Sequence, residues 1–87
     1  MNYVYILHSR KDNGLYVGYT KDLKKRFKQH SSGKSLATKY RLPVRLIYYE
    51  AFLMNADAKA REKYLKSGYG REQLKAILRG LFKKLNI

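Results

Sequence analysis

The sequence has no cysteine, no tryptophan, one proline and two histidines among 87 residues. The absence of cysteine excludes disulfides and thiolate metal sites, and histidines at only positions 8 and 30 argue against a zinc site. Any bound metal should therefore be a hard ion held by oxygen atoms. The chain also lacks an apolar run near the ~18 residues of a membrane span, and it lacks a signal-peptide pattern. We expect a cytoplasmic protein that does not enter membranes.

Acidic residues are the second scarcity, since six Asp and Glu stand against twenty Lys and Arg, which gives a net charge of +14. Such an excess destabilises a compact chain through self-repulsion, and a polyanionic partner would offset it. Nucleic acid is the partner that we expect ahead of a membrane surface. The hydrophobic fraction of 45% with 14% aromatic residues is typical of a packed core, and the length allows one domain, residues 1–87.

The patterns of apolar residues predict an α/β (α+β) fold in the order ββαβαα, with a small antiparallel sheet flanked by helices. The turn residues Asp12, Asn13 and Gly14 join the first two strands as a hairpin. Asp22 suits the first turn of a helix, and Asn55 is a plausible N-cap for the next one. The expected strands cover residues 3–8, 15–20 and 44–52, and the expected helices cover residues 22–30 and about 56–66. A third helix is expected after the interruption at residues 67–70, with its apolar positions from Leu74 to Leu85.

Tyrosines on the two hairpin strands are candidates for chemistry. Alternation places Tyr3, Tyr5 and Leu7 on one face of the first strand, and Tyr16 shares a face with Gly18 on the second. A glycine inside a strand suggests the close approach of another backbone or a ligand. Tyrosines in strands usually only pack the sheet. A tyrosine becomes reactive when nearby cations lower its pKa from ~10, and this chain has many cations.

Three residues on the predicted helices could act with these tyrosines. Arg26 and His30 are four apart and emerge on one side of their helix, where an arginine could grip a phosphate and a histidine could relay a proton. Glu62 falls within the apolar stripe of its helix, and a carboxylate aimed inward needs a partner. That partner could be Arg61, Lys59 or a divalent metal.

The order and spacing of these residues along the chain resemble those of the GIY-YIG nuclease family. The ordered spacing carries the resemblance, because each tripeptide motif alone has little value. The span is residues 3–66, and the Leu65-Lys66-Ser67-Gly68 ending with Gly70-Arg71-Glu72 looks like the compact stand-alone bacterial branch. The matching motifs are Tyr3-Val4-Tyr5, Tyr16-Val17-Gly18, Gly18-Tyr19-Thr20, Asp22-Leu23, Arg26, His30 and Glu62.

The resemblance implies a GIY-YIG fold, with a three-stranded antiparallel sheet and with Tyr5, Tyr16, Arg26, His30 and Glu62 converging on one face. It also implies metal-dependent hydrolysis of DNA phosphodiester bonds, in a family that serves repair and recombination. Glu62 would bind one Mg²⁺ or Mn²⁺ and Arg26 would hold the phosphate. Tyr5 would act on the water as general base with help from His30, and Tyr16 would position water or phosphate, although either tyrosine could be the base.

The sequence departs from the family pattern at three places. Tyr3 and Val4 replace Gly and Ile in the first motif, and Val17 replaces Ile in the second. Many members carry an asparagine in the helix after the metal-binding glutamate, and residues 74–78 contain none, which bears on the level of activity. The rival interpretations are a nucleic-acid-binding module without cleavage and an RNA-associated structural protein.

The DNA track is predicted from charge alone. A basic loop contributes Lys34, Lys39 and Arg41, and the outer side of the last helix adds further cations. Duplex, branched and single-stranded DNA all remain open as substrates.

Overall fold

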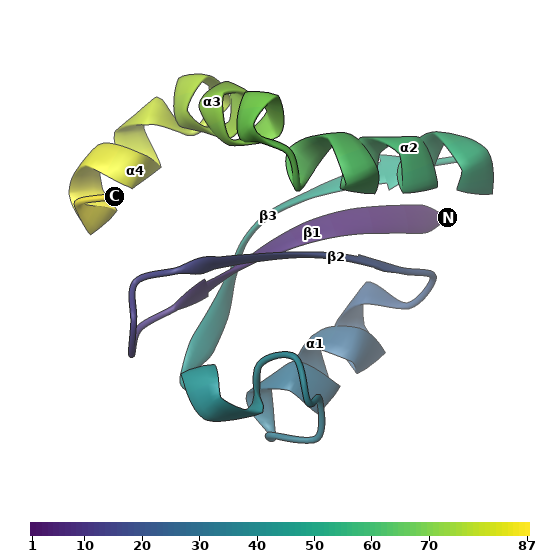
Figure 1. Cartoon of the computed structure of the whole chain (residues 1–87). Coiled ribbons are helices and arrows are strands. Elements are labelled where there is room, and N and C mark those ends of the chain that lie inside the picture. Colours follow the sequence, from purple (N-terminus) through teal and green to yellow (C-terminus); the bar gives the residue numbers. More distant parts are fainter.

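The computed structural model describes all 87 residues, which form three layers of α+β type (Figure 1). The sheet forms the middle layer. Helices α2, α3 and α4 cover one face, and α1 with the short 3₁₀ helix η1 covers the other. The elements are β1 (Asn2–Ser9), β2 (Leu15–Thr20), α1 (Leu23–Ser31), η1 (Lys39–Arg41), β3 (Val44–Phe52), α2 (Asn55–Leu65), α3 (Gly68–Ile77) and α4 (Arg79–Leu85).

The sheet has the order β2-β1-β3, with both pairs antiparallel. Strand β1 is central, and its side chains are buried on both faces. Val4 and Ile6 join the main core beneath α2, α3 and α4, whereas Tyr5 stands on the opposite face and reaches His30 of α1. The predicted alternation of β1 and the predicted three-stranded antiparallel sheet are therefore confirmed. No helix is long and apolar enough to cross a membrane.

Local sequence explains where α1 and the hairpin begin and turn. The Asp22 carboxylate accepts a hydrogen bond from the backbone nitrogen of Lys25 at 3.0 Å, so Asp22 is the N-cap of α1. Asn13 occupies the tip of the hairpin with φ of 61°, a conformation that asparagine tolerates better than most residues. The turn predicted at residues 12–14 is confirmed.

Two predictions about the helices are wrong. Asn55 is not an N-cap, because it is the first residue of α2 and its side-chain amide donates to the Tyr19 hydroxyl. The last helix is two helices that meet at Leu78, whose φ of −113° and ψ of 34° interrupt the regular backbone. The bend keeps Phe82 in the core at 3% exposure, so burial of this ring overrides the continuous helical pattern of the sequence.

Candidate active site

Tyr5 of β1, Tyr16 of β2 and His30 of α1 meet on the face of the sheet that α1 covers. The Tyr5 hydroxyl and His30 Nε2 form a buried hydrogen bond of 2.8 Å. The ring centroid of Tyr16 lies 6.2 Å from that of Tyr5 and 5.1 Å from that of His30. Three elements that are distant in the sequence thus bring two phenols and an imidazole into one cluster.

Gly18 makes room for Tyr5. The two residues are opposite each other in the β1–β2 register, and a Cβ atom on Gly18 would lie 2.4 Å from Cζ of the Tyr5 ring. The sequence predicted that Gly18 marks a close approach, and the approaching group is a side chain rather than a backbone or a ligand. Any larger residue at position 18 would displace the Tyr5 ring.

A loop after α1 supplies two polar residues that sequence reasoning missed. His30 Nδ1 and Thr38 Oγ1 form a buried hydrogen bond of 2.7 Å, and both residues are fully buried. Ser35 accepts a hydrogen bond from Arg26 Nη2 at 3.4 Å. The sequence predicts residues 34–41 to be a basic DNA-binding loop, and no local pattern indicates that Ser35 and Thr38 turn inward.

Arg26 completes the cluster from the same side of α1 as His30, as the spacing predicted. Its Nη1 donates to Gln29 Oε1 at 3.0 Å. The charge of Arg26 acts on the pKa values of both Tyr5 and His30. The structure therefore brings Tyr5, Tyr16, Arg26 and His30 together.

Burial decides the protonation states in this cluster. It raises the pKa of Tyr5 to about 12, and the Arg26 guanidinium opposes that rise only in part. Burial also lowers the pKa of His30 to about 4, and the Arg26 charge lowers it further. At neutral pH the pair is a neutral phenol and a neutral imidazole. The expectation that cations would pull down the pKa of such a tyrosine is wrong for Tyr5, because desolvation outweighs the nearby charge.

Glu62 lies in a different layer, on α2 across the sheet from α1 (Figure 1). Its side chain is 19% exposed and forms an ion pair of 3.1 Å with Lys66. It makes no hydrogen bond or ion pair with Tyr5, Tyr16, Arg26 or His30. The predicted inward position is only partly right. Glu62 therefore does not directly contact the other four residues that were expected to converge with it.

Both predicted protein partners of Glu62 are engaged elsewhere. Arg61 forms an ion pair of 2.8 Å with Glu50 of β3, and Lys59 lies 4.1 Å above the ring of Tyr19. Lys66 was not foreseen as a partner, although a lysine four residues after a glutamate on a helix is a favourable pair.

Lys66 also connects Glu62 to the tyrosine cluster. It lines a cavity of about 460 Å³ together with Tyr16, at the free edge of β2. The ion partner of Glu62 therefore lies beside Tyr16. A ligand that wraps around this edge could contact both layers of the molecule.

The side chains offer little for a metal on their own, because no group of three or more His, Asp or Glu residues could hold an ion. Glu62 is one half-buried carboxylate with one cationic partner. Mg²⁺ commonly binds through one or two carboxylates and completes its shell with water and substrate phosphate. The donor set thus fits a site that substrate completes, provided that Lys66 releases Glu62.

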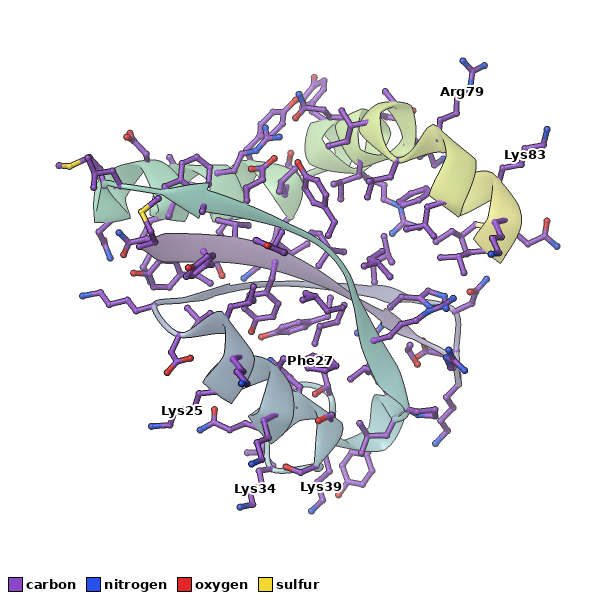
Figure 2. The ribbon with its side chains drawn as sticks, turned by 180° about the vertical axis from the view of Figure 1, so that it is seen from behind. Lys25, Phe27, Lys34, Lys39, Arg79 and Lys83 are labelled. Atoms are coloured by element: carbon purple, nitrogen blue, oxygen red, sulfur yellow. The ribbon has the colours of Figure 1, made fainter.

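The three basic residues predicted to bind nucleic acid differ in availability. Lys34 and Lys39 are exposed and project from the region of α1 (Figure 2). Arg41 is half-buried, and its Nε donates to Asp12 at 3.1 Å, so it already has a carboxylate partner. The cations of the last helix, including Arg79 and Lys83, project from the opposite side of the molecule (Figure 2).

Comparison with known proteins identifies the family. A family described as the GIY-YIG catalytic domain matches residues 1–75. The chain belongs to the GIY-YIG family. This is a nuclease family, and its match covers the tyrosine cluster and Glu62.

Relatives of this GIY-YIG protein are small bacterial proteins. A UPF0213 protein of Clostridium perfringens is 44% identical over 88% of this chain and 83% of its own length. One from Streptococcus pyogenes is 44% identical over 87% and 83%, respectively. The solution NMR structure of a UPF0213 protein from Bacillus halodurans is 41% identical, with a TM-score of 0.56 over 88% of this chain and 85% of that one. The predicted resemblance and fold class are confirmed.

Proposed function

We propose that this GIY-YIG protein is a metal-dependent DNA endonuclease that hydrolyses phosphodiester bonds, with a place in DNA repair or recombination. The observation that carries the proposal is the buried hydrogen bond between Tyr5 and His30 beside the cation of Arg26. Phosphodiester hydrolysis needs a group that takes a proton from water and a cation that stabilises the charged phosphate. This cluster contains both.

In this proposal Arg26 holds the scissile phosphate through its guanidinium. The Tyr5 oxygen accepts a proton from the attacking water while the Tyr5 proton passes to His30 Nε2. The oxygen of water bonds to phosphorus, the bond from phosphorus to the leaving oxygen breaks, and the leaving oxygen takes a proton from solvent. His30 then returns its extra proton to solvent, so that both residues regain their starting state. Tyr16 stands close enough to both rings to position the water or the phosphate.

The low pKa of His30 is the obstacle to this relay, and phosphate binding reduces it. Part of the depression comes from the charge of Arg26. A phosphate anion on Arg26 would offset that charge, so the pKa of His30 would rise when substrate binds. Burial is the largest cause of the low pKa and would remain, so His30 would accept a proton more readily in the complex than in the free protein.

Glu62 would hold the divalent ion, Mg²⁺ or Mn²⁺, together with substrate phosphate and water. When bound, such an ion neutralises charge on the phosphate oxygens and activates water. Lys66 must release the Glu62 carboxylate for this to happen. The released ammonium would remain at the β2 edge, where it lines the cavity with Tyr16.

The test is cleavage of plasmid and single-stranded DNA with Mg²⁺, with Mn²⁺ and with chelator. We expect metal-dependent cleavage that Glu62→Gln reduces by at least about a hundredfold. Glu72→Gln is the matched control, because Glu72 is exposed on α3 and pairs only with Lys75 at 3.7 Å. Full activity of Glu62→Gln would refute the metal assignment.

The alternative function is a nucleic-acid-binding module of weak or absent activity. Two observations favour it, since Lys66 occupies the Glu62 carboxylate and α3 contains no asparagine. It predicts DNA binding that is independent of metal, with no cleavage of any DNA. Absence of cleavage with tight binding would establish this alternative over the endonuclease.

A further inference from the structure

Three lysines surround a small hollow on the outer side of α1. Lys25 and Lys28 come from α1 and Lys34 from the following loop, and together with Gln29 and Ser32 they line a space of about 290 Å³. Figure 2 shows Lys25 and Lys34 projecting from this part of the molecule. We call these five residues the lysine hollow.

The lysine hollow contains no compensating negative charge. None of its lining residues is acidic, and the four ion pairs of the structure involve Arg41, Arg61, Lys66 and Lys75 instead. Three like charges around one space repel each other and lower stability. An anion in the hollow would relieve that repulsion.

Gln29 connects the lysine hollow to the candidate active site. It lines the hollow, and its Oε1 accepts a hydrogen bond from Arg26 Nη1 at 3.0 Å. The loop that carries Lys34 also carries Ser35, which accepts a hydrogen bond from Arg26 Nη2. An anion in the hollow would therefore be separated by the Gln29 side chain from the guanidinium that, under the proposed function, holds the scissile phosphate.

We propose that the lysine hollow is a second phosphate subsite, which binds a backbone phosphate of the same nucleic-acid strand that Arg26 contacts at the cleavage position. The inference rests on the proposed function for its nucleic-acid partner and for the phosphate contact of Arg26. The subsite fixes the path of the strand across α1, so that one phosphate in the hollow places another at Arg26.

The test measures DNA affinity in chelator, so that cleavage plays no part. The hollow variant carries Lys25→Gln, Lys28→Gln and Lys34→Gln. The matched control carries Arg10→Gln, Lys59→Gln and Lys63→Gln, which removes the same charge from exposed residues of the hairpin turn and of α2, away from α1. Fluorescence anisotropy with a short fluorescein-labelled DNA gives the dissociation constant at several salt concentrations.

We expect the hollow variant to bind about ten- to a hundredfold more weakly, whereas the control should lose less than about threefold. The slope of log affinity against log salt should fall by about 2 to 3 in the hollow variant only. Equal losses in the two variants, unchanged affinity in the hollow variant, or a wild type that does not bind DNA would each overturn the subsite.

Two further measurements complete the test. Inorganic phosphate should compete only weakly with DNA, because a strand contacts the hollow and Arg26 at once; full competition at millimolar concentration would identify a site for free anions and overturn the strand assignment. Thermal unfolding should show an unchanged or higher midpoint for the hollow variant, since it removes repulsion. A loss of cleavage in wild type with these binding results intact would reject the endonuclease and leave the subsite standing.

Discussion

The free energy of unfolding should fall steeply when the pH drops below the pKa of an ordinary histidine, because His30 is buried as a neutral ring. Its pKa is lowered from 6.5 to about 4 in the folded protein. Between these two values the unfolded chain binds a proton that the folded chain does not, so acid favours unfolding. Above pH 6.5 both states carry the neutral ring, and the effect vanishes.

The magnitude follows from the two pKa values. Integrating the difference in bound protons from pH 8 to pH 4.5 gives a loss of roughly 2–3 kcal/mol in the free energy of unfolding. For a domain of this size that corresponds to a decrease of about 10–20 °C in the unfolding midpoint. Carboxyl groups with a lowered pKa, such as Glu50 beside Arg61, lose their stabilising contribution mainly below the ordinary carboxyl pKa of 4.5. The loss of stability from His30 and the loss from the carboxyl groups therefore fall in adjacent pH ranges.

The assay is urea unfolding of wild type and His30→Gln at pH values from 4.5 to 8 and constant ionic strength. His30→Gln retains a side chain that can hydrogen-bond to Tyr5, but it cannot titrate. The difference between the two proteins removes contributions from all other groups. This difference in the free energy of unfolding should change by about 2–3 kcal/mol across this range. A difference that stays constant with pH would show that His30 titrates normally and would refute the neutral pair.

Three other substitutions should distinguish residues that position Tyr5 and His30 from a residue that only stabilises the fold. Gly18→Ala should cost about 1–3 kcal/mol and reduce any cleavage activity, because the new methyl would displace the Tyr5 ring; urea unfolding and plasmid cleavage measure the two losses. Thr38→Val should shift the pH dependence of cleavage because the hydrogen bond to His30 Nδ1 is lost, and Thr38→Ser should restore it; equal profiles in both variants would contradict the positioning role. Arg61→Leu should cost about 1–3 kcal/mol and lose stability without moving that pH profile, since it leaves the half-buried Glu50 carboxylate unpaired far from His30.

Residues on regular elements could be placed from the sequence. The period of two on β1 put Tyr5 on the face opposite Val4 and Ile6, and the period of 3.6 on α1 put Arg26 and His30 on one side. These positions depend on local backbone geometry, which a short stretch of sequence largely dictates. The meeting of Tyr5 with His30 was implied by the family resemblance.

Local sequence patterns do not predict contacts between segments that are distant in the sequence. Ser35 and Thr38 follow α1 in a loop without periodicity, and nothing local indicates that their hydroxyls turn inward to Arg26 and His30. The bend at Leu78 has the same origin, because burial of Phe82 against the sheet is a tertiary effect.

The case of Glu62 shows both sides. The sequence placed Glu62 on its helix with a partly inward position, but it did not give the partner of Glu62. Arg61 pairs with Glu50 and Lys59 contacts the Tyr19 ring, both on the sheet. Lys66 is therefore the residue that pairs with Glu62. The sequence by itself determined the family, the order of the strands and helices as far as α3, and the side chains available for chemistry, because motif spacing and periodicity are local. Only the tertiary structure decided which groups touch and which protonation states they hold, because desolvation and ion pairing depend on what the rest of the chain brings beside each side chain.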